Sequence, residues 1–182
     1  MNKKLKIDNN ISLFSPSSWI ENNLSKNSSK MSLLDLACGN GRHSVFAANA
    51  GYQVTSVDID KNKLVSLKNN KFVNPIQVNL EINKPWPFRN EIFDVVLVTN
   101  YLYRPIFKYI LNSIKLNGKL FYETFTEENI IFGKPNNKNF LLKPQELLNY
   151  ARSNRFEVIN YEEILISKPI KKAVQRIYAI KK

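Results

Sequence analysis

The stretch LLDLACGNGRHS, residues 33–44, holds an acid, Asp35, followed closely by Gly39 and Gly41. The apolar residues before the glycines are typical of a strand that is buried on both faces. Small residues in the turn after such a strand let the backbone approach a ligand closely. The helix expected after Gly41 would add free N–H groups and partial positive charge. The pattern predicts a pocket for a nucleotide-like ligand with an anionic group.

A second acid, Asp58, ends the next predicted strand, 17 residues after Gly41. A carboxylate at this place can accept hydrogen bonds from both hydroxyls of a ribose. The dinucleotide fingerprint G-x-G-x-x-G is incomplete, because Ser44 stands where the third glycine belongs. Asp35 would also repel a pyrophosphate near Gly39, whereas it suits an ammonium group. S-adenosylmethionine carries a ribose, an ammonium and a carboxylate and fits best; a dinucleotide-dependent oxidoreductase is the alternative.

The motif from Asp35 through Ala37 and Gly39 to Gly41 resembles the first motif of class I S-adenosylmethionine-dependent methyltransferases. Other stretches resemble the small bacterial tellurite-resistance-like (TehB-type) members of that class: VDID, NLE, PWPF, FDVVLVTNYLYRP, LFYETF and FLLKPQEL. The resemblance runs from about Ser32 to the C-terminus. It implies an α/β three-layer sandwich of the Rossmann-like methyltransferase fold. Its seven-stranded sheet would have the order 3-2-1-4-5-7-6, with the last strand antiparallel.

The resemblance also implies which residues hold S-adenosylmethionine and its product S-adenosylhomocysteine. They stand at the ends of the first four predicted strands: Asp35, Ala37, Cys38, Gly39, Gly41, Asp58, Ile59, Asn79, Leu80, Thr99 and Asn100. The first motif would line the methionine part, Asp58 the ribose, and Ile59 the adenine ring. Asn79 replaces an acid that relatives often carry near the adenine amino group, and its carbonyl can still accept from an N–H. Cys38 has an alternative role as a small buried side chain.

Candidate catalytic residues are Asn100, Tyr101 and Tyr103, together with His43, the only histidine. The first three follow the fourth predicted strand, in the loop nearest the reactive methyl in the resembled fold. Both prolines of an Asn-Pro-Pro-Tyr motif are absent there, which counts against methylation of amides or exocyclic amines. The tyrosines have core or rim packing as an alternative. His43 either faces the site as a base or packs inside the fold.

Apolar periodicity and turn residues predict alternating strands and helices, typical of a mostly parallel sheet covered on both faces. The predicted strands are 31–37, 53–57, 75–78, 93–98, 119–125, 156–166 and 173–180. The predicted helices are 42–50, 61–69, 105–116 and 144–153. Residues 1–30 form an N-terminal extension with a short helix near Trp19, and 31–182 form the methyltransferase domain. The long connection 125–140 is interpreted as a substrate lid, and Arg104 either binds an anionic substrate or covers the sheet edge.

The net charge of +12 is concentrated in residues 134–182, which have 11 Lys or Arg and 4 Glu. A basic surface indicates RNA or an anionic substrate. Lys provides 21 of the 27 basic residues, and 25 Asn accompany them. This composition favours drift in base composition, because phosphate recognition prefers Arg. The single cysteine excludes an intrachain disulfide, and no secretory signal or membrane span is evident. We expect a cytoplasmic protein without a membrane partner.

Three functions are consistent with these patterns. The first is a methyltransferase acting on a small molecule such as a thiol, a chalcogen oxyanion or a metabolite. It is favoured because no strong base is evident and soft nucleophiles need little proton removal. The second is an RNA or protein methyltransferase that uses the basic C-terminal part. The third is a non-catalytic cofactor-binding or partner domain. No metal site is predicted, and the oligomeric state is left open.

Overall fold

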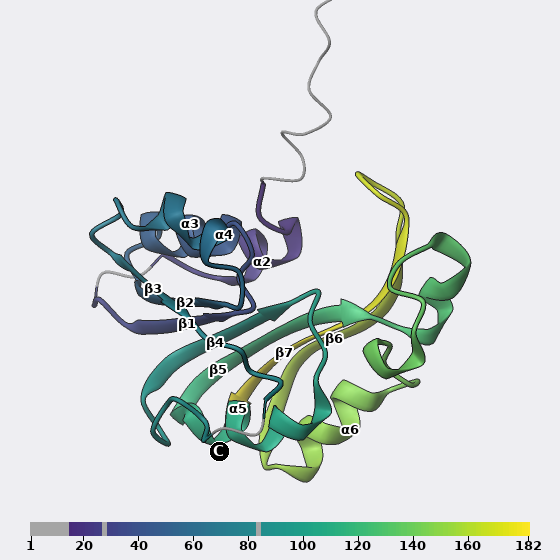
Figure 1. Ribbon diagram of the computed structural model, residues 1–182. Helices are drawn as coiled ribbons and strands as arrows, with labels where there is room; N and C mark the ends of the chain where they lie inside the picture. The colour runs from purple at the N-terminus through teal and green to yellow at the C-terminus, as the bar shows by residue number, and fades with distance from the viewer. Residues whose placement is uncertain (1–14, 27–28, 83–84) are drawn as a thin grey trace, which may run out of the picture.

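The computed structural model describes residues 15–26, 29–82 and 85–182, which form a seven-stranded sheet between two layers of helices (Figure 1). The strand order is β3-β2-β1-β4-β5-β7-β6, with β7 antiparallel to both of its neighbours. This confirms the predicted fold and strand order. The strands are β1 (Ser32–Leu36), β2 (Gln53–Asp58), β3 (Val73–Gln77), β4 (Phe93–Thr99), β5 (Ile114–Phe125), β6 (Phe156–Ile166) and β7 (Lys172–Lys181).

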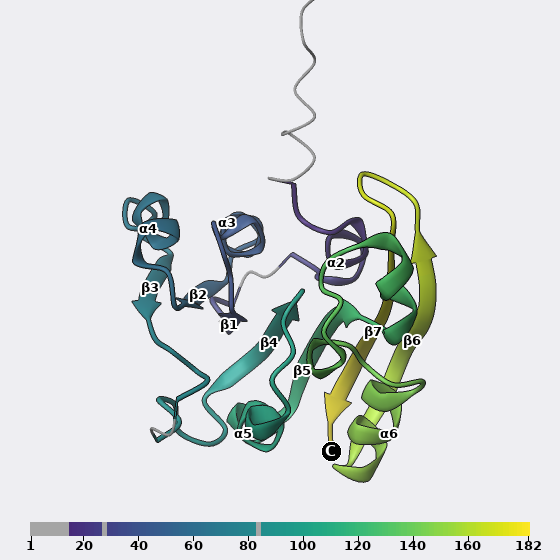
Figure 2. The same cartoon turned by 45° about the vertical axis from the view of Figure 1, so that its right-hand side comes forward.

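The α-helices divide between the two faces of the sheet. They are α2 (Ser18–Asn23), α3 (Arg42–Asn49), α4 (Lys61–Leu64), α5 (Phe107–Ser113) and α6 (Glu146–Ser153). Figure 2 shows α2, α3 and α4 on one face and α5 and α6 on the other. Short 3-10 turns complete the chain: η1 (Val65–Leu67), η2 (Arg104–Ile106), η3 (Glu127–Phe132) and η4 (Lys138–Phe140). In the described part of the chain, no helix has the length and apolar character needed to cross a bilayer.

Strand β1 shows why its sequence is an unbroken apolar run. Leu33 belongs to the buried cluster under α2 and α3, whereas Leu34 and Leu36 belong to the cluster under α5 and α6. Successive side chains of a strand point to opposite faces, so a strand covered on both sides needs apolar residues throughout. The exception is Asp35, which is fully buried between these leucines.

The predicted helix at 105–116 is wrong at its C-terminal end. The α-helix α5 ends at Ser113, because Ile114 pairs with Phe93 and begins β5. The apolar spacing is helical, but pairing with β4 overrides it. Gly118 lies in the resulting irregularity, where an added Cβ would come 2.8 Å from the Lys115 carbonyl oxygen. The helix predicted at 61–69 is shorter too, since η1 follows α4, and α6 begins two residues later than predicted.

The short helix predicted in the N-terminal extension is α2, and it packs into the main core. Trp19 and Ile20 are buried, and the Trp19 ring meets Phe121 of β5 edge-on, with centroids 5.9 Å apart. Ser17 at its N-terminus makes no capping bond; its hydroxyl instead donates to Glu123 Oε2 at 3.1 Å. The helix therefore connects residues before the first motif with the end of β5.

Arg104 fastens the connection between β5 and α6 to the sheet. Its guanidinium donates to both carboxylate oxygens of Glu146, at 2.6 and 2.8 Å. It also donates to the carbonyl oxygens of Asn139 and Leu141, at 2.9 and 2.8 Å. Because these bonds use four of its five N–H donors, Arg104 has a structural role. Of the two expected roles, anion binding is therefore not supported, and covering of the sheet edge stays a prediction.

The connection at 125–140, interpreted above as a substrate lid, is folded into η3 and η4. Asn129 is buried within it. Its side-chain oxygen accepts from the Ala173 N–H at 3.2 Å, and its amide donates to the Pro135 carbonyl at 3.3 Å. These bonds attach the connection to the start of β7, where it forms a wall of the second cavity described below.

Candidate functional site

The turn after β1 has the left-handed backbone that its small residues allow. Ala37, Gly39 and Gly41 have φ values of 53°, 58° and 75°. The Cys38 N–H donates to the Val57 carbonyl at 2.9 Å and so continues the pairing with β2. The turn thus leaves the sheet at the carboxyl ends of β1 and β2, where ligands bind in open α/β sheets.

Asp58, at the end of β2, holds this turn in place. Its Oδ2 accepts the Gly39 N–H at 2.8 Å, and its Oδ1 accepts the Asp60 N–H at 2.9 Å. The residue is 7% exposed. A carboxylate has about four acceptor positions, so each oxygen can accept one further bond from a ligand. Asp58 therefore both shapes the glycine turn and offers two acceptors side by side.

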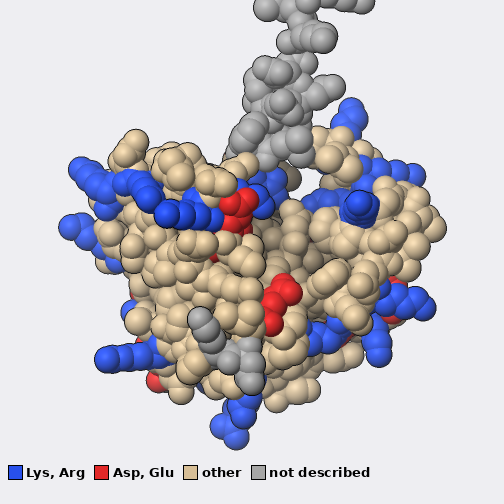
Figure 3. Space-filling model, viewed as in Figure 1, with Lys and Arg blue, Asp and Glu red and all other residues tan. Residues whose placement is uncertain are grey.

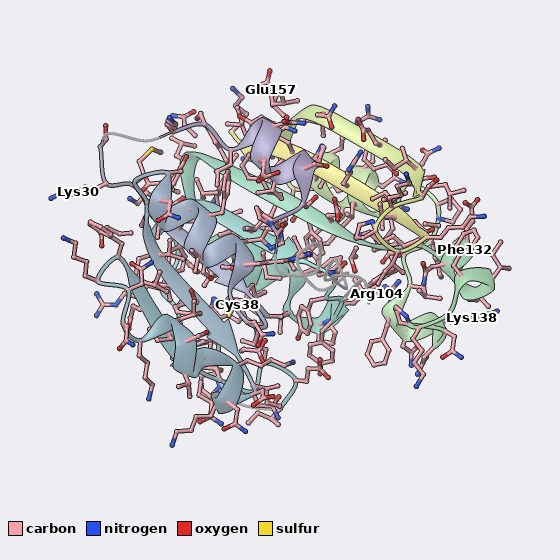
Figure 4. All side chains as sticks on the ribbon, turned by 90° about the horizontal axis from the view of Figure 1, so that it is seen from above. Lys30, Cys38, Arg104, Phe132, Lys138 and Glu157 are labelled. Carbon is pink, nitrogen blue, oxygen red and sulfur yellow. The ribbon has the colours of Figure 1, made fainter. Side chains whose placement is uncertain are left out.

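A cavity of about 630 Å³ lies above this turn; we call it the cofactor cavity after the ligand that the sequence predicts for it. Most of the predicted cofactor residues line it: Ala37, Cys38, Gly39, Asp58, Ile59, Asn79, Leu80, Thr99 and Asn100. Figure 3 shows a hollow in the upper middle of the molecule, with acidic and basic atoms along its border. Figure 4 looks onto this edge and places Cys38 near its middle, with Arg104 and Phe132 further toward the C-terminal half.

The two glycines of the turn have different roles. A Cβ added to Gly39 would meet nothing within 4 Å, so this position opens onto the cavity. A Cβ added to Gly41 would come 2.5 Å from the Leu67 side chain. Gly41 is not among the residues that line the cavity. Both glycines are expected to clear space for the ligand. This stays a prediction for Gly39, which lines the cavity, whereas Gly41 does not line it and allows η1 to pack against the turn.

Replacing these glycines by alanine should separate binding from folding. We expect Gly41→Ala to lower the free energy of unfolding by about 2 kcal/mol, because the methyl group overpacks the contact with Leu67. Gly39→Ala should cost only about 1 kcal/mol, from its left-handed backbone. Its methyl group enters the cavity, however, and should weaken S-adenosylhomocysteine binding roughly tenfold. Urea unfolding and calorimetry measure the two effects, and a reversed pattern would contradict this assignment.

Asp35, which is expected to act on the ligand either directly or through the glycine turn, does not line the cavity. It is fully buried, and its Oδ2 accepts the Ser44 hydroxyl at 2.6 Å. Ser44 in turn accepts from the Ser56 hydroxyl at 2.7 Å. The other carboxylate oxygen, Oδ1, has no hydrogen-bond partner among the residues that the structure describes. Burial raises the pKa of Asp35 to about 7. Asp35 thus joins β1 to α3 and, through Ser44, to β2.

His43 is not placed as a general base. It is 1% exposed, and its Nε2 accepts the Ser17 N–H at 3.0 Å. Because Nε2 accepts, the ring proton lies on Nδ1, which contacts the Thr99 hydroxyl at 3.3 Å. Burial, with Arg42 nearby, lowers the pKa of His43 to about 3. The catalytic hypothesis for His43 is therefore wrong: a neutral imidazole joins α3 to the N-terminus of α2 and to β4.

The other three catalytic candidates separate in space. Asn100, with φ of 53°, lines both the cofactor cavity and a second cavity beside it. Tyr101 lines the cofactor cavity, where burial and the nearby Glu81 carboxylate raise the pKa of its phenol, so it stays protonated. Tyr103 lines neither; it borders a third cavity of about 730 Å³ together with Trp86. Asn100 thus holds the most central place.

Three charged residues in the cofactor cavity were missed in the sequence. Arg42, Lys63 and Glu81 all line it. Glu81 stands two residues after Asn79, and its N–H donates to the Asn79 side-chain oxygen at 2.9 Å. An acid is therefore present beside the position where relatives often carry one. The available signals were the place of Arg42 directly after the glycine turn and the short distance of Glu81 along the chain from Asn79.

The second cavity, of about 690 Å³, shares Arg42 and Asn100 with the first. Glu123, at the end of β5, lies in its wall and is 0% exposed. One carboxylate oxygen accepts from Lys172 at 3.0 Å, and the other accepts from Ser17 and lies 3.6 Å from Arg176. Two adjoining cavities at the carboxyl edge of the sheet can hold a donor and an acceptor side by side.

Residues 34–105 match a protein family described as methyltransferase domain. No curated protein sequence matches the chain. Among solved structures, TehB from Haemophilus influenzae superposes with a TM-score of 0.71 at 22% identity, covering 92% of this chain and 63% of that one.

Two other solved structures have the same fold. A SAM-dependent methyltransferase from Aquifex aeolicus superposes with a TM-score of 0.67 at 15% identity, covering 97% of this chain and 95% of that one. Geranyl diphosphate C-methyltransferase from Streptomyces coelicolor, in complex with geranyl diphosphate and S-adenosyl-L-homocysteine, gives 0.65 at 13% identity over 91% and 78%. These structures show that the chain has the seven-stranded fold of S-adenosylmethionine-dependent methyltransferases, and residues 34–105 of that fold match the methyltransferase domain family.

Proposed function

We propose that the protein transfers the methyl group of S-adenosylmethionine to a small acceptor whose nucleophile is soft or already anionic. The observation that carries this proposal is the pair of adjoining cavities that share Arg42 and Asn100. When bound, S-adenosylmethionine supplies an electrophilic methyl group on a sulfonium. The protein's own contribution is to hold both reactants close and aligned, which is the main source of rate in such a displacement.

The residues of the first cavity fit this cofactor. Asp58 offers two carboxylate oxygens to the ribose hydroxyls, and the open space at Gly39 admits the methionine part. Arg42 would bind the methionine carboxylate, because its guanidinium makes one hydrogen bond to the Ser15 carbonyl and keeps further donors. Glu81 would accept from the adenine amino group, while Ile59, which is 58% exposed, would cover the ring.

The nature of the acceptor follows from the groups that could remove a proton. His43 is buried with both ring nitrogens in contact, and Glu123 is held by two cations and a hydroxyl. Tyr101 keeps its proton. None of these is suited to deprotonate an amine or an alcohol. A thiolate or another acceptor that is anionic at neutral pH needs no such base, which favours this class.

Calorimetry with S-adenosylhomocysteine and with NAD tests the cofactor, and a product assay tests the reaction. We expect S-adenosylhomocysteine to bind and NAD not to bind. S-adenosylhomocysteine should form with thiols but not with the matched alcohols or amines. Failure of S-adenosylhomocysteine to bind would indicate a non-catalytic partner domain. Turnover with bulk RNA alone, with affinity falling steeply in salt, would establish the RNA methyltransferase instead.

A further inference from the structure

The lining of the second cavity has polar, apolar and basic parts, and these indicate which kind of ligand the cavity can hold. Its inner wall is polar, with the buried Glu123 accepting the hydroxyl of the half-buried Ser17. Apolar side chains follow toward the outside, among them Phe125, Phe132 and Ile166. A volume of about 690 Å³ is in the range of small organic ligands and far larger than one inorganic oxyanion needs.

The outer rim of this cavity is basic. Lys134 on the connection before α6 lies on one side, and Lys168 and Lys171 on the β6–β7 turn lie on the other. All three are exposed, and among the described residues no acid lies within ion-pair distance of them. Figure 3 shows basic atoms along the right-hand border of the hollow. Lys171 also lies over the Phe132 ring, with its Nζ 4.7 Å from the ring centroid, a contact that leaves its charge without an acidic partner. Cations on two facing segments attract an anion between them.

The acids in the lining do not cancel this charge. Glu123 is neutralised inside the wall by Lys172 and Arg176. Glu21 on α2 is the other acidic residue of the lining, against six Lys or Arg. A ligand that reaches from Asn100 to the rim therefore meets Arg42 and the ion-paired Glu123 at its inner end, then an apolar middle and a cationic mouth.

We infer that the methyl acceptor is an organic anion with an apolar body, whose carboxylate or phosphate lies between Lys134, Lys168 and Lys171 while its nucleophile reaches Asn100. This inference rests on the proposed function, because it names the acceptor of the same reaction. Lysines are point charges without the planar fork of arginine, so they accommodate a carboxylate and a phosphate alike. The apolar wall requires a carbon body between the anionic group and the nucleophile.

Binding to the protein saturated with S-adenosylhomocysteine tests this inference without requiring turnover. The probes are mercaptohexanoate, mercaptohexyl phosphate, mercaptohexanol, aminohexanethiol and selenite, each titrated by calorimetry. We expect one or both organic anions to bind at least tenfold more tightly than the neutral and cationic thiols. Comparison of mercaptohexanoate with mercaptohexyl phosphate shows whether the rim binds a carboxylate or a phosphate more tightly. Equal binding of mercaptohexanol, or selenite binding as tightly as the organic anions, would overturn the inference.

A triple variant tests whether the anionic group of the ligand binds at this rim. It combines Lys134→Gln, Lys168→Gln and Lys171→Gln. Surface charges of this kind contribute about 0.5 kcal/mol each, so the three together should weaken the organic anion about tenfold and leave mercaptohexanol unchanged. The matched control replaces three exposed lysines outside the lining, Lys61, Lys68 and Lys108, by Gln. Equal losses in the two triple variants would also overturn the inference.

The inference and the proposed function fail in different ways. If S-adenosylhomocysteine itself does not bind, the first titration shows it, and the proposed function is wrong. If it binds and the organic anions do not, only the assignment of the acceptor is wrong.

Discussion

Replacing Asp58 by alanine should weaken the binding of S-adenosylhomocysteine about 100-fold or more. Two hydrogen bonds from ribose hydroxyls to a buried carboxylate contribute about 1.5–3 kcal/mol each, and 2.7 kcal/mol corresponds to 100-fold. The variant also releases the Gly39 N–H from its bond of 2.8 Å, so the turn loses its support on β2. Isothermal calorimetry with S-adenosylhomocysteine measures the loss directly.

Asp60→Ala is the matched control for this variant. It removes the same charge two residues further along, where the Asp60 side chain accepts the Asn62 N–H at 2.9 Å and caps α4. Loss of this cap should cost about 1 kcal/mol of unfolding free energy and leave the binding of S-adenosylhomocysteine almost unchanged. Similar affinities of the two variants would contradict the ribose assignment of Asp58.

Asp35 and His43 should make opposite contributions to the pH dependence of stability. Burial raises the pKa of Asp35 from 3.8 to about 7, so between pH 4.5 and 6 it binds a proton only in the folded protein. Burial lowers the pKa of His43 from 6.5 to about 3, so in the same range it binds a proton only in the unfolded chain. Folding therefore takes up one proton at Asp35 and releases one at His43. Because these two effects cancel, the two groups together should change the wild-type free energy of unfolding little between pH 4.5 and 6.

Single variants should expose each contribution. In His43→Gln, Asp35 remains, and the free energy of unfolding should fall by about 1.4 kcal/mol per unit as pH rises from 4.5 to 6. In Asp35→Asn, His43 remains, and the free energy of unfolding should rise with pH by a similar amount. Urea unfolding at pH 4.5 and 6, compared with wild type, measures both slopes. If the free energy of unfolding changes equally with pH in wild type, His43→Gln and Asp35→Asn, the folded protein does not hold Asp35 protonated and His43 neutral.

Much of the fold could be predicted because the sequence pattern and the tertiary packing agree. Strands buried on both faces, such as β1 and β4, read as unbroken apolar runs, and the periodicity of helices between them indicates a layered sheet. The end of α5 could not be predicted in this way. Its apolar spacing continues into Ile114, and only pairing with Phe93 turns that residue into a strand.

The candidate cofactor site was predictable where it depends on the ends of neighbouring parallel strands. Gly39 and the acid Asp58 stand at strand ends, and parallel strands bring their carboxyl ends to one edge. Glu81 and Arg42 were missed although they stand in the stretches NLE and LLDLACGNGRHS, because only the folded chain shows that they line the cavity.

By itself, the sequence determined the sheet, the turn and the acid beside it, because these depend on residue type and spacing along the chain. Only the tertiary structure decided that His43 is a neutral packing residue and that Gly41 faces Leu67 instead of the cavity. It also decided that Arg104 is paired with Glu146, whereas Lys134 and Lys168 have no acidic partner among the described residues. Both of these lysines lie at the rim of the second cavity. The reason is that burial, pairing and charge neutralisation depend on neighbours distant in sequence, which local patterns do not encode.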